Sequence, residues 1–208
     1  MTRRSRSSGR WLKEHFSDPF VQKAREAGYR SRAVFKLEEI DRRERLLRPK
    51  QVVLDLGAAP GAWSQYARRR IGSAGRIIAT DILPLEPIAG VEFVQGDFRE
   101  AEVLEQLRSL LPPRGVDVVL SDMAPNLAGV DAIDQPRAAY LAELALAMAG
   151  DVLKEGGSAL IKVFQGAGFE ELRRAARDQF GKVKLVKPEA SRSRSAEMYL
   201  LAMQFRLV

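Results

Sequence analysis

The sequence predicts an α/β fold in which a mostly parallel sheet is covered by helices on both faces. Short apolar runs typical of strands alternate with segments of helical periodicity through most of the chain. Strands that alternate with helices form parallel sheets, because each helix returns the chain across the sheet. The last two strands, 182–186 and 197–205, have no helix between them, so we expect them to pair antiparallel.

Each expected element follows from its own pattern of residues. A helix is expected over 31–47, where apolar residues recur at helical spacing and Ser31 is a candidate cap. The other expected helices cover residues 62–71, 101–111, 135–154 and 169–180. The expected strands before the final pair are short apolar runs at residues 51–57, 75–81, 91–97, 116–122 and 157–164. The segment 188–196 is polar, basic and rich in turn residues, so we expect an exposed loop there.

Composition restricts the class of protein. The 208 residues are 46% hydrophobic, which is enough for one sizeable core. No apolar run approaches the length of about 18 residues that a transmembrane helix needs. There is no cysteine, which excludes disulfides and thiolate metal sites and fits a reducing cytoplasm. The single histidine, His15, cannot form a histidine metal cluster alone, so we expect it to pack or to face water.

The net charge of +7 is concentrated at one end of the chain. Residues 1–50 hold 15 Lys and Arg against 7 Asp and Glu, a balance of +8, whereas the other 158 residues hold 19 against 20. Four arginines and no acid lie in residues 1–10. Such an arm is suited to bind phosphates, and it equally fits a solvated tail. A mitochondrial transit peptide is a third interpretation, against which the early Glu14 and Asp18 argue.

The expected strands bring four aspartates to one edge of the sheet. They lie at or near the ends of the first four strands and are Asp55, Asp81, Asp97 and Asp122. The carboxyl ends of parallel strands share an edge, and the ligands of open α/β sheets bind beyond it. A single aspartate at such a position is often a helix cap or a turn residue. Four of them in register favour a ligand-binding rim.

The turn after the first strand indicates which class of ligand the rim could bind. It holds Gly57 and Gly61 with Ala59 between them, which departs from the G-x-G-x-x-G fingerprint of nicotinamide dinucleotides. An aspartate close to the turn would also repel a pyrophosphate. The Gly-Lys-Ser/Thr of a P-loop is absent from the sequence. A ligand with a cationic end, hydroxyls and an amine fits better, and S-adenosylmethionine has all three.

Lys162 is an unusual feature of the fifth strand. It interrupts an apolar run that extends from Ala159 to Phe164, where an ammonium group is costly to bury without a partner. A lysine in such surroundings can act as a base, because burial and like charge favour the neutral amine. A buried structural ion pair is the other interpretation. Lys36, on the expected helix 31–47, is either a second lysine of the site or a surface lysine whose stem covers apolar side chains.

Several motifs resemble those of one protein family over nearly the whole chain. They are SSGRWLKEHFSDPFV, GYRSRAVFKLEEI, VLDLGAAPGAWSQY, GRIIATDILPLEPIAGV, FVQGDF, SDMAPNLAG, KVFQGAGF and SRSRSAEMYL. The most specific are GAAPGAW and SDMAPN. On these motifs the sequence resembles the FtsJ-type ribosomal RNA large-subunit (uridine-2′-O)-methyltransferases. Ala62 departs from the pattern, because the family usually has glycine there.

The resemblance implies a fold and a set of site residues. The fold is a Rossmann-like, S-adenosylmethionine-dependent methyltransferase domain with a seven-stranded sheet over 31–208, after a basic, RNA-contacting segment over 1–30. The implied catalytic residues are Lys36, Asp122, Lys162 and Glu197, with Lys162 as the general base. The implied cofactor contacts are Gly61, Trp63, Asp81, Asp97 and Asp122, to which the rim and its first turn add Asp55 and Gly57. No metal is expected.

The resemblance also implies a substrate, which is a uridine ribose in the RNA of the assembled large ribosomal subunit. A cytoplasmic monomer without a membrane partner is expected. A neutral Lys162 would take the proton of the 2′-hydroxyl, which is a poor nucleophile without a positioned base. Methylation of a base is less favoured, since the stretch after Asp122 has no aromatic residue to stack a base. A non-catalytic RNA-binding or ribosome-assembly factor is the alternative from a different class, and the basic end alone would fit it.

Overall fold

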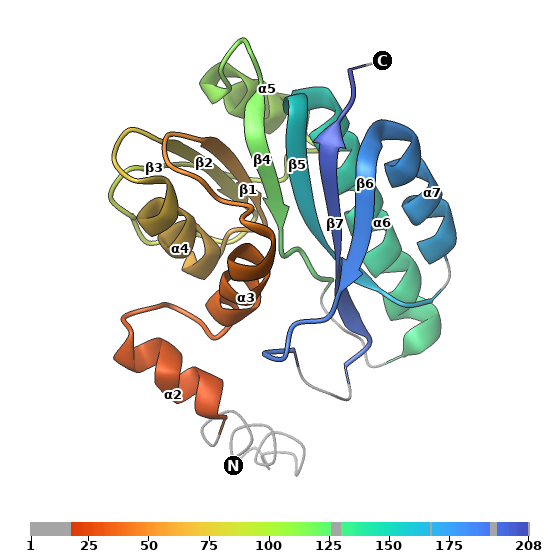
Figure 1. Cartoon of the computed structure of the whole chain (residues 1–208), viewed down its shortest axis with the longest axis horizontal. Coiled ribbons are helices and arrows are strands. Elements are labelled where there is room, and N and C mark those ends of the chain that lie inside the picture. Colours follow the sequence, from red (N-terminus) through yellow and green to blue (C-terminus); the bar gives the residue numbers. More distant parts are fainter. Residues whose placement is uncertain (1–17, 126–129, 167, 192–194, 208) are drawn as a thin grey trace, which may run out of the picture.

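The computed structural model describes residues 18–125, 130–166, 168–191 and 195–207. Its strands form one seven-stranded sheet. Across the sheet the strands follow the order β3-β2-β1-β4-β5-β7-β6 (Figure 1). The strands are β1 (Val52–Leu56), β2 (Arg76–Asp81), β3 (Val91–Gln95), β4 (Val116–Ser121), β5 (Leu153–Phe164), β6 (Phe180–Val186) and β7 (Glu197–Phe205). The helices are α2 (Pro19–Glu26), α3 (Val34–Glu44), α4 (Ala62–Ile71), α5 (Ala101–Leu110), α6 (Asp131–Val152) and α7 (Phe169–Gln179). The predicted α/β fold is confirmed.

The position of β7 determines which residues meet in the sheet. Strands β1 to β5 are parallel, whereas β7 lies between β5 and β6 and runs antiparallel to both, as expected for the last pair. The register between β5 and β7 sets Lys162 opposite Tyr199 and Phe164 opposite Glu197. Residues that are about 35 positions apart in the sequence therefore become cross-strand neighbours, whose side chains interact directly.

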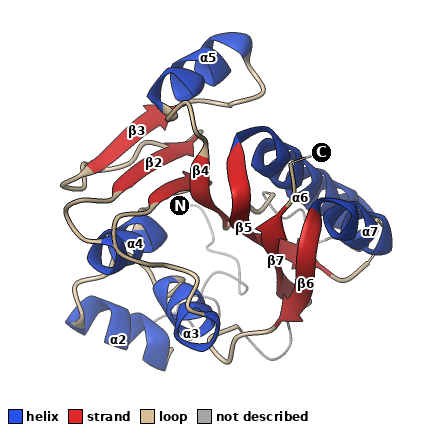
Figure 2. Cartoon of the chain, turned by 45° about the horizontal axis from the view of Figure 1, so that its top comes forward, coloured by secondary structure: helices blue, strands red, loops and turns tan. Residues whose placement is uncertain are grey.

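Helices cover both faces of the sheet, as predicted (Figure 2). Helices α3 and α4 pack on one face, where Leu160 of β5 and Leu201 of β7 join their apolar side chains. Helices α5, α6 and α7 pack on the other face, together with Ile161 of β5 and Leu200 of β7. Successive residues of a strand point to opposite faces, so both faces of β5 and β7 are apolar and buried. This explains the continuous apolar run around Lys162.

Helix α2 lies within the segment 1–30, where the sequence analysis expected no helix. The carboxylate of Asp18 accepts a hydrogen bond from the backbone N–H of Phe20 at 2.9 Å, and Pro19 occupies the first helical position. An aspartate cap followed by proline is a helix-start signal that the analysis overlooked. The ring of Phe20 packs 5.7 Å from that of Phe35, so α2 is attached to α3. Residues 1–10 and His15 lie outside the described residues.

The boundary between α6 and β5 differs from the prediction. Helix α6 was expected over 135–154, but it begins one turn earlier and includes Pro136 inside it. It ends at Val152, and β5 begins at once with Leu153, which pairs with Val116 across an irregularity in the ladder. The strand was expected to begin only at Gly157, so its first four residues, Leu153 to Gly156, were not predicted.

The predicted exposed loop over 188–196 is wrong for its first part. Ala190 and Ser191 are buried, and the backbone oxygen of Ala190 accepts a hydrogen bond from the guanidinium of Arg32. The carboxylate of Glu39 also accepts a hydrogen bond from the backbone N–H of Glu189 at 2.8 Å. Polar composition predicted exposure, whereas contacts with the start of α3 fix this part of the loop. In the described part of the chain, no helix is long and apolar enough to cross a membrane.

Candidate active site

A hollow of about 410 Å³ opens beyond the carboxyl ends of the parallel strands. Four of the predicted site residues line it, and they come from the ends of the first four strands: Gly57, Asp81, Asp97 and Asp122. Apolar side chains complete the wall, including Ile82, Leu83, Phe98, Met123, Leu141 and Leu144. Apolar walls with a few convergent polar groups are typical of a small-molecule site. We call this hollow the rim pocket.

The turn after β1 requires its glycines. Gly57 has a φ of +73°, and a Cβ there would lie 2.5 Å from the Cγ of Met123. Gly61 has a φ of +106°, and a Cβ there would lie 2.7 Å from the Cδ1 of Ile88. The carboxylate of Asp81 accepts a hydrogen bond from the backbone N–H of Ala59 at 2.8 Å and thereby ties the turn to β2. Only glycine adopts such backbone angles without strain, so the turn brings main chain close to the rim pocket.

Asp97 is held in the ionised form by a neighbouring arginine. The Nε of Arg99 donates to both carboxylate oxygens of Asp97 at 2.9 Å, and the backbone N–H of Arg99 donates to one of them at 3.0 Å. These hydrogen bonds lower the pKa of Asp97. The guanidinium of Arg99 also lies over the ring of Tyr140, 5.8 Å from its centre. Asp97 therefore presents a charged acceptor at the edge of the rim pocket.

Asp55 is fully buried behind the same turn. Its Oδ2 accepts a hydrogen bond from the hydroxyl of Ser64 at 2.6 Å, while its Oδ1 has no partner among the described residues. The pKa of Asp55 is raised to about 7, mainly by burial and to a smaller extent by the charges of Asp122 and Asp81, while the Ser64 hydrogen bond lowers it. A buried carboxylate oxygen without a partner is costly and favours a cationic or hydrogen-bonding group nearby.

Replacing Asp55 by asparagine is expected to stabilise the protein more as the pH rises. The pKa of Asp55 is about 7 in the folded protein and 3.8 for the free carboxyl. Between these values the folded state binds more protons than the unfolded state, so the free energy of unfolding of the wild type falls as the pH rises. The variant lacks this loss. We expect this gain to grow by a few kcal/mol between pH 4 and pH 8, because each pKa unit corresponds to about 1.4 kcal/mol.

Urea unfolding of both proteins across this pH range measures the effect. Asp151→Asn, at an exposed carboxyl, is the control and should show no such trend. A difference between Asp55→Asn and the wild type that does not change with pH would contradict the raised pKa.

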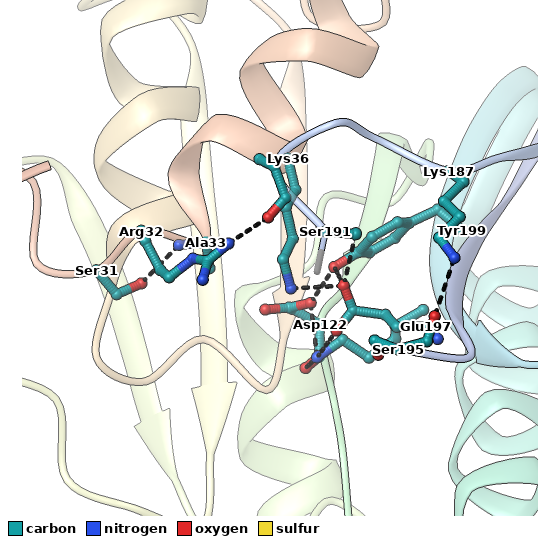
Figure 3. Close-up of polar contacts among 12 residues, drawn as sticks. Ser31, Arg32, Ala33, Lys36, Asp122, Lys187, Ser191, Ser195, Glu197 and Tyr199 are labelled. Carbon is teal, nitrogen blue, oxygen red and sulfur yellow. Dashed lines mark hydrogen bonds and ion pairs between the residues drawn. The ribbon is translucent and has the colours of Figure 1, made fainter. Parts of the chain in front are cut away.

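A second hollow of about 310 Å³ lies beside the rim pocket and includes Lys36 and Glu197 among its lining residues. The Nζ of Lys36 lies 2.6 Å from the Oε1 of Glu197, and both side chains are largely buried. The hydroxyl of Ser191 donates to the same oxygen at 2.9 Å. Figure 3 shows this convergence of α3, the loop before β7 and the start of β7. Lys36 is therefore an ion-paired lysine of the cluster rather than a surface lysine.

Lys162 lies between Asp122 of the rim pocket and Glu197 of the second hollow. Its side chain is only 8% exposed, and its Nζ lies 2.8 Å from the Oδ1 of Asp122 and 3.9 Å from the Oε2 of Glu197. The Nζ also donates a hydrogen bond to the backbone oxygen of Asp122 at 2.8 Å. Asp122 lines the rim pocket and Glu197 lines the second hollow. The four predicted catalytic residues thus form one cluster of two lysines and two carboxylates.

Tyr199 belongs to this cluster, and the sequence analysis missed it. Its hydroxyl donates to the Oδ1 of Asp122 at 2.7 Å and lies 3.4 Å from the Oε1 of Glu197. Burial, and then the charges of Asp122 and Glu197, raise the pKa of Tyr199 well above its ordinary value, so the phenol keeps its proton and remains a donor. Tyr199 follows Glu197 by two residues on a strand, and this spacing places both side chains on one face. That spacing was the signal in the sequence.

Three predicted cofactor residues do not line the rim pocket. Asp55 and Gly61 lie behind and beside its first turn, as described above. Trp63 is buried under α3, where its Nε1 donates to the backbone oxygen of Ala33 at 2.8 Å. Its ring packs 5.6 Å from that of Tyr199. Trp63 therefore fixes the start of α3, and with it Lys36, relative to the cluster.

The sheet and the site together define a class of protein. A mostly parallel sheet with an antiparallel strand inserted next to its edge, a carboxylate-lined rim pocket and an adjoining buried lysine describe a Rossmann-like methyltransferase. The model of the FtsJ-like methyltransferase family matches residues 29–205. The chain belongs to this family.

Known proteins of similar sequence and structure agree with this assignment. The chain is 60% identical over 201 residues to ribosomal RNA large subunit methyltransferase E of Stenotrophomonas maltophilia, covering 97% of this chain and 96% of that one. It is 54% identical over 204 residues to the protein of that name from Marinobacter nauticus, covering 98% and 99%. A crystal structure described as a ribosomal RNA methyltransferase from Plasmodium falciparum has a TM-score of 0.74 at 27% identity, covering 85% of this chain and 98% of that one.

A more distant structure shows the same fold. Fibrillarin of Aeropyrum pernix, crystallised with bound S-adenosyl-L-methionine, has a TM-score of 0.57 at 18% identity, covering 82% of this chain and 73% of that one. Within the described residues, no group of three or more histidine, cysteine or acidic side chains is arranged to hold a metal ion.

Proposed function

We propose that this protein methylates the 2′-hydroxyl of a uridine ribose in the RNA of the assembled large ribosomal subunit, with S-adenosylmethionine as methyl donor. We further propose that it acts in the cytoplasm as a monomer. The names of its relatives from Stenotrophomonas and Marinobacter support large-subunit ribosomal RNA as the substrate. The observation that carries the proposal is the ion pair of Lys162 with Asp122 and its proximity to Glu197, which join the rim pocket to the second hollow.

The rim pocket has the chemistry that S-adenosylmethionine requires. That molecule carries an ammonium, a sulfonium, a ribose diol and an adenine amine, and it supplies a methyl group on electron-poor sulfur. Asp81 and Asp97 offer charged acceptors for the hydroxyls and the adenine amine, while Phe98 and Leu144 offer apolar walls. The carboxylate of Asp122, which lines the pocket, favours the cationic end. The residues present therefore fit this cofactor.

The lysine and carboxylate cluster supplies proton removal and positioning. A ribose in the second hollow would approach Lys162 from the side of Lys36 and Glu197. The Nζ of Lys162 would accept the proton of the 2′-hydroxyl while the methyl group passes from the cofactor sulfur, whose bond to it breaks, to the ribose oxygen. Asp122 orients that Nζ through its carboxylate and its backbone oxygen, and Tyr199 holds the carboxylate. Lys36 and Glu197 orient the ribose. Placing the reacting atoms in line is worth several kcal/mol of the barrier.

A labelled-methyl assay tests the proposal. Large ribosomal subunits that lack this modification are incubated with labelled S-adenosylmethionine and the full-length protein, and the labelled nucleotide is then mapped. We expect one labelled uridine with the methyl on its ribose. Label on a base would overturn the ribose target. Binding to subunits without transfer of label would instead support the non-catalytic assembly factor.

Removing residues 1–10 is expected to weaken binding to the large subunit and to lower its salt dependence. The segment holds four arginines and no acid, and each arginine that contacts a phosphate releases counterions. The slope of log affinity against log salt should fall by about 0.7 for each lost contact to a single strand. Affinity for S-adenosylmethionine should not change. An unaltered salt slope would show that this segment makes no phosphate contact.

A further inference from the structure

A third hollow, of about 630 Å³, lies away from the catalytic cluster, between the end of α3 and the exposed side of α4. Arg42, Arg45, Arg48 and Arg70 line it, together with Glu38 and Asp41. Glu38, Arg42 and Arg45 are spaced by four and three residues on α3 and its cap, so they share one helix face. Helices α3 and α4 lie side by side on the same face of the sheet (Figures 1 and 2). We call this hollow the arginine hollow.

The positive charge of the arginine hollow is not neutralised by its own acids. The buried carboxylate of Asp41 accepts hydrogen bonds from the backbone N–H of Leu47 at 2.7 Å, the hydroxyl of Tyr66 at 2.9 Å and the Nε of Arg70 at 2.8 Å. Asp41 and Arg70 therefore pair with each other. In the described part of the chain, Arg42, Arg45 and Arg48 form no ion pair with an acid, and their side chains are exposed. Three guanidinium groups thus face solvent against a single carboxylate, that of Glu38.

Backbone geometry holds two of these arginines in place. Arg45 ends α3 in the left-handed region, with a φ of 54°. Its backbone N–H donates a hydrogen bond to the backbone oxygen of Asp41 at 2.7 Å. A residue other than glycine adopts that region at a cost, which the surrounding contacts must outweigh. The Nε of Arg48 donates to the backbone oxygen of Arg45, and the backbone N–H of Arg48 donates to Gln51 at 2.6 Å. The arginines therefore project from a fixed turn.

The arginine hollow and the catalytic cluster are on opposite sides of α3. Lys36 of the cluster and Arg45 are nine residues apart on α3 and its cap, which corresponds to about 13 Å along the helix axis and about half a turn around it. An RNA strand whose ribose occupies the second hollow would therefore pass around α3 to reach these arginines. Guanidinium groups donate two parallel hydrogen bonds to phosphate and are weakly hydrated, which suits a phosphodiester backbone.

We propose that Arg42, Arg45 and Arg48 form a second RNA-binding site, which contacts backbone phosphates of the ribosomal RNA beyond the nucleotide that is methylated. This inference rests on the proposed function and assigns a further part of the substrate to a separate surface. The three arginines follow one another along the end of α3 and the loop after it. This arrangement suits several successive phosphates of a strand better than a single free anion. The site contributes affinity and orientation but no sequence reading, because phosphate contacts do not distinguish bases.

A triple variant tests the second site in the full-length protein. Arg42→Gln and Arg48→Gln remove charge, and Arg45→Asn does so with a residue that tolerates the left-handed region. The matched control removes three charges from α7, on the other face of the sheet, through Arg173→Gln, Arg174→Gln and Arg177→Gln. Binding to large ribosomal subunits and to protein-free large-subunit RNA is measured over a range of salt concentrations. Methyl transfer and S-adenosylmethionine affinity are measured alongside.

We expect the hollow variant to lower the slope of log affinity against log salt by about 2, since each of three contacts to a single strand contributes about 0.7. If affinities converge near 1 M salt, this slope corresponds to about 100-fold weaker binding near 0.1 M salt. KM for the subunit should rise while kcat and cofactor affinity stay the same. The α7 control should bind as the wild type does.

Several outcomes would overturn the second site. An unchanged salt slope would do so, and so would a slope that changes equally in the α7 control. A slope that changes with subunits but not with protein-free RNA would point to an acidic ribosomal protein instead. Loss of thermal stability with unchanged RNA affinity would leave the arginines a role only at the negative end of the α3 dipole. If the triple variant does not fold, Arg48→Gln alone should lower the slope by about 0.7. A wild-type protein that neither binds nor methylates RNA would refute the proposed function itself.

Discussion

Replacing Lys162 by alanine or by arginine is expected to abolish methyl transfer while leaving cofactor affinity nearly unchanged. Removal of a general base typically costs about 10²- to 10⁴-fold in rate. Arginine keeps a positive charge beside Asp122 and Glu197, where the Lys162 side chain is 8% exposed, but its guanidinium stays protonated and cannot accept the proton of the 2′-hydroxyl. Single-turnover transfer of labelled methyl to large subunits, with S-adenosylmethionine affinity measured by calorimetry, gives both quantities.

The same strand supplies a control for Lys162. Lys154, near the other end of β5, pairs with Asp117 at 2.5 Å and lies far from both hollows. Lys154→Ala and Lys154→Arg should leave the transfer rate unchanged. If Lys162 served only as a structural ion pair, arginine would restore most activity and alanine would mainly lower thermal stability. A folded and fully active Lys162→Arg protein would therefore exclude the general base and leave Lys162 as a positioning group.

Replacing Asp97 by alanine is expected to weaken S-adenosylmethionine binding by roughly 10- to 150-fold. This is the loss of one hydrogen bond to a charged group, on the order of 1.5–3 kcal/mol. Arg99 keeps Asp97 ionised and oriented at the edge of the rim pocket, so the carboxylate is ready to accept a hydrogen bond from an amine. Calorimetry with S-adenosylmethionine, and with its demethylated product, measures the change.

Adding Arg99→Ala to Asp97→Ala distinguishes two causes of the weaker binding. If the guanidinium of Arg99 blocked the pocket after losing Asp97, the double variant of Asp97 and Arg99 would recover affinity. If Asp97 itself binds the cofactor, the double variant remains as weak as Asp97→Ala. Unchanged affinity in Asp97→Ala would remove Asp97 from the site.

Periodicity and turn chemistry predicted most of the fold because each strand and helix is a local pattern. Helix α4 and strand β7 have the bounds that were expected, and the last two strands pair antiparallel. The insertion of β7 between β5 and β6 was not predicted, since strand order depends on packing between distant segments. Helix α2 was missed because the basic charge of its region suggested an arm, although Asp18 and Pro19 carried the helix signal.

The residues of the candidate site that lie at the ends of parallel strands could be predicted from the sequence. Asp81, Asp97 and Asp122 each follow a parallel strand, and a parallel sheet brings such positions to one edge. The meeting of Lys36, Glu197 and Lys162 came from the family resemblance, because three separate elements contribute them. Tyr199 was predicted only as part of the last strand, and the cross-strand register shows that it lies opposite Lys162. The arginine hollow was not predicted, because the spacing of Arg42, Arg45 and Arg48 does not show that Asp41 pairs with the distant Arg70.

The inserted position of β7 has a consequence for when the enzyme matures during translation. Synthesis proceeds from the N-terminus, so β5 and β6 leave the ribosome before the strand that must separate them. The rim pocket is built from residues that precede β5. Glu197 and Tyr199, by contrast, arrive only with β7. A nascent chain that ends after β6 would therefore contain the residues of the rim pocket but lack two members of the cluster around Lys162. The cluster around Lys162 is thus completed as one of the last events of synthesis, after the residues of the rim pocket.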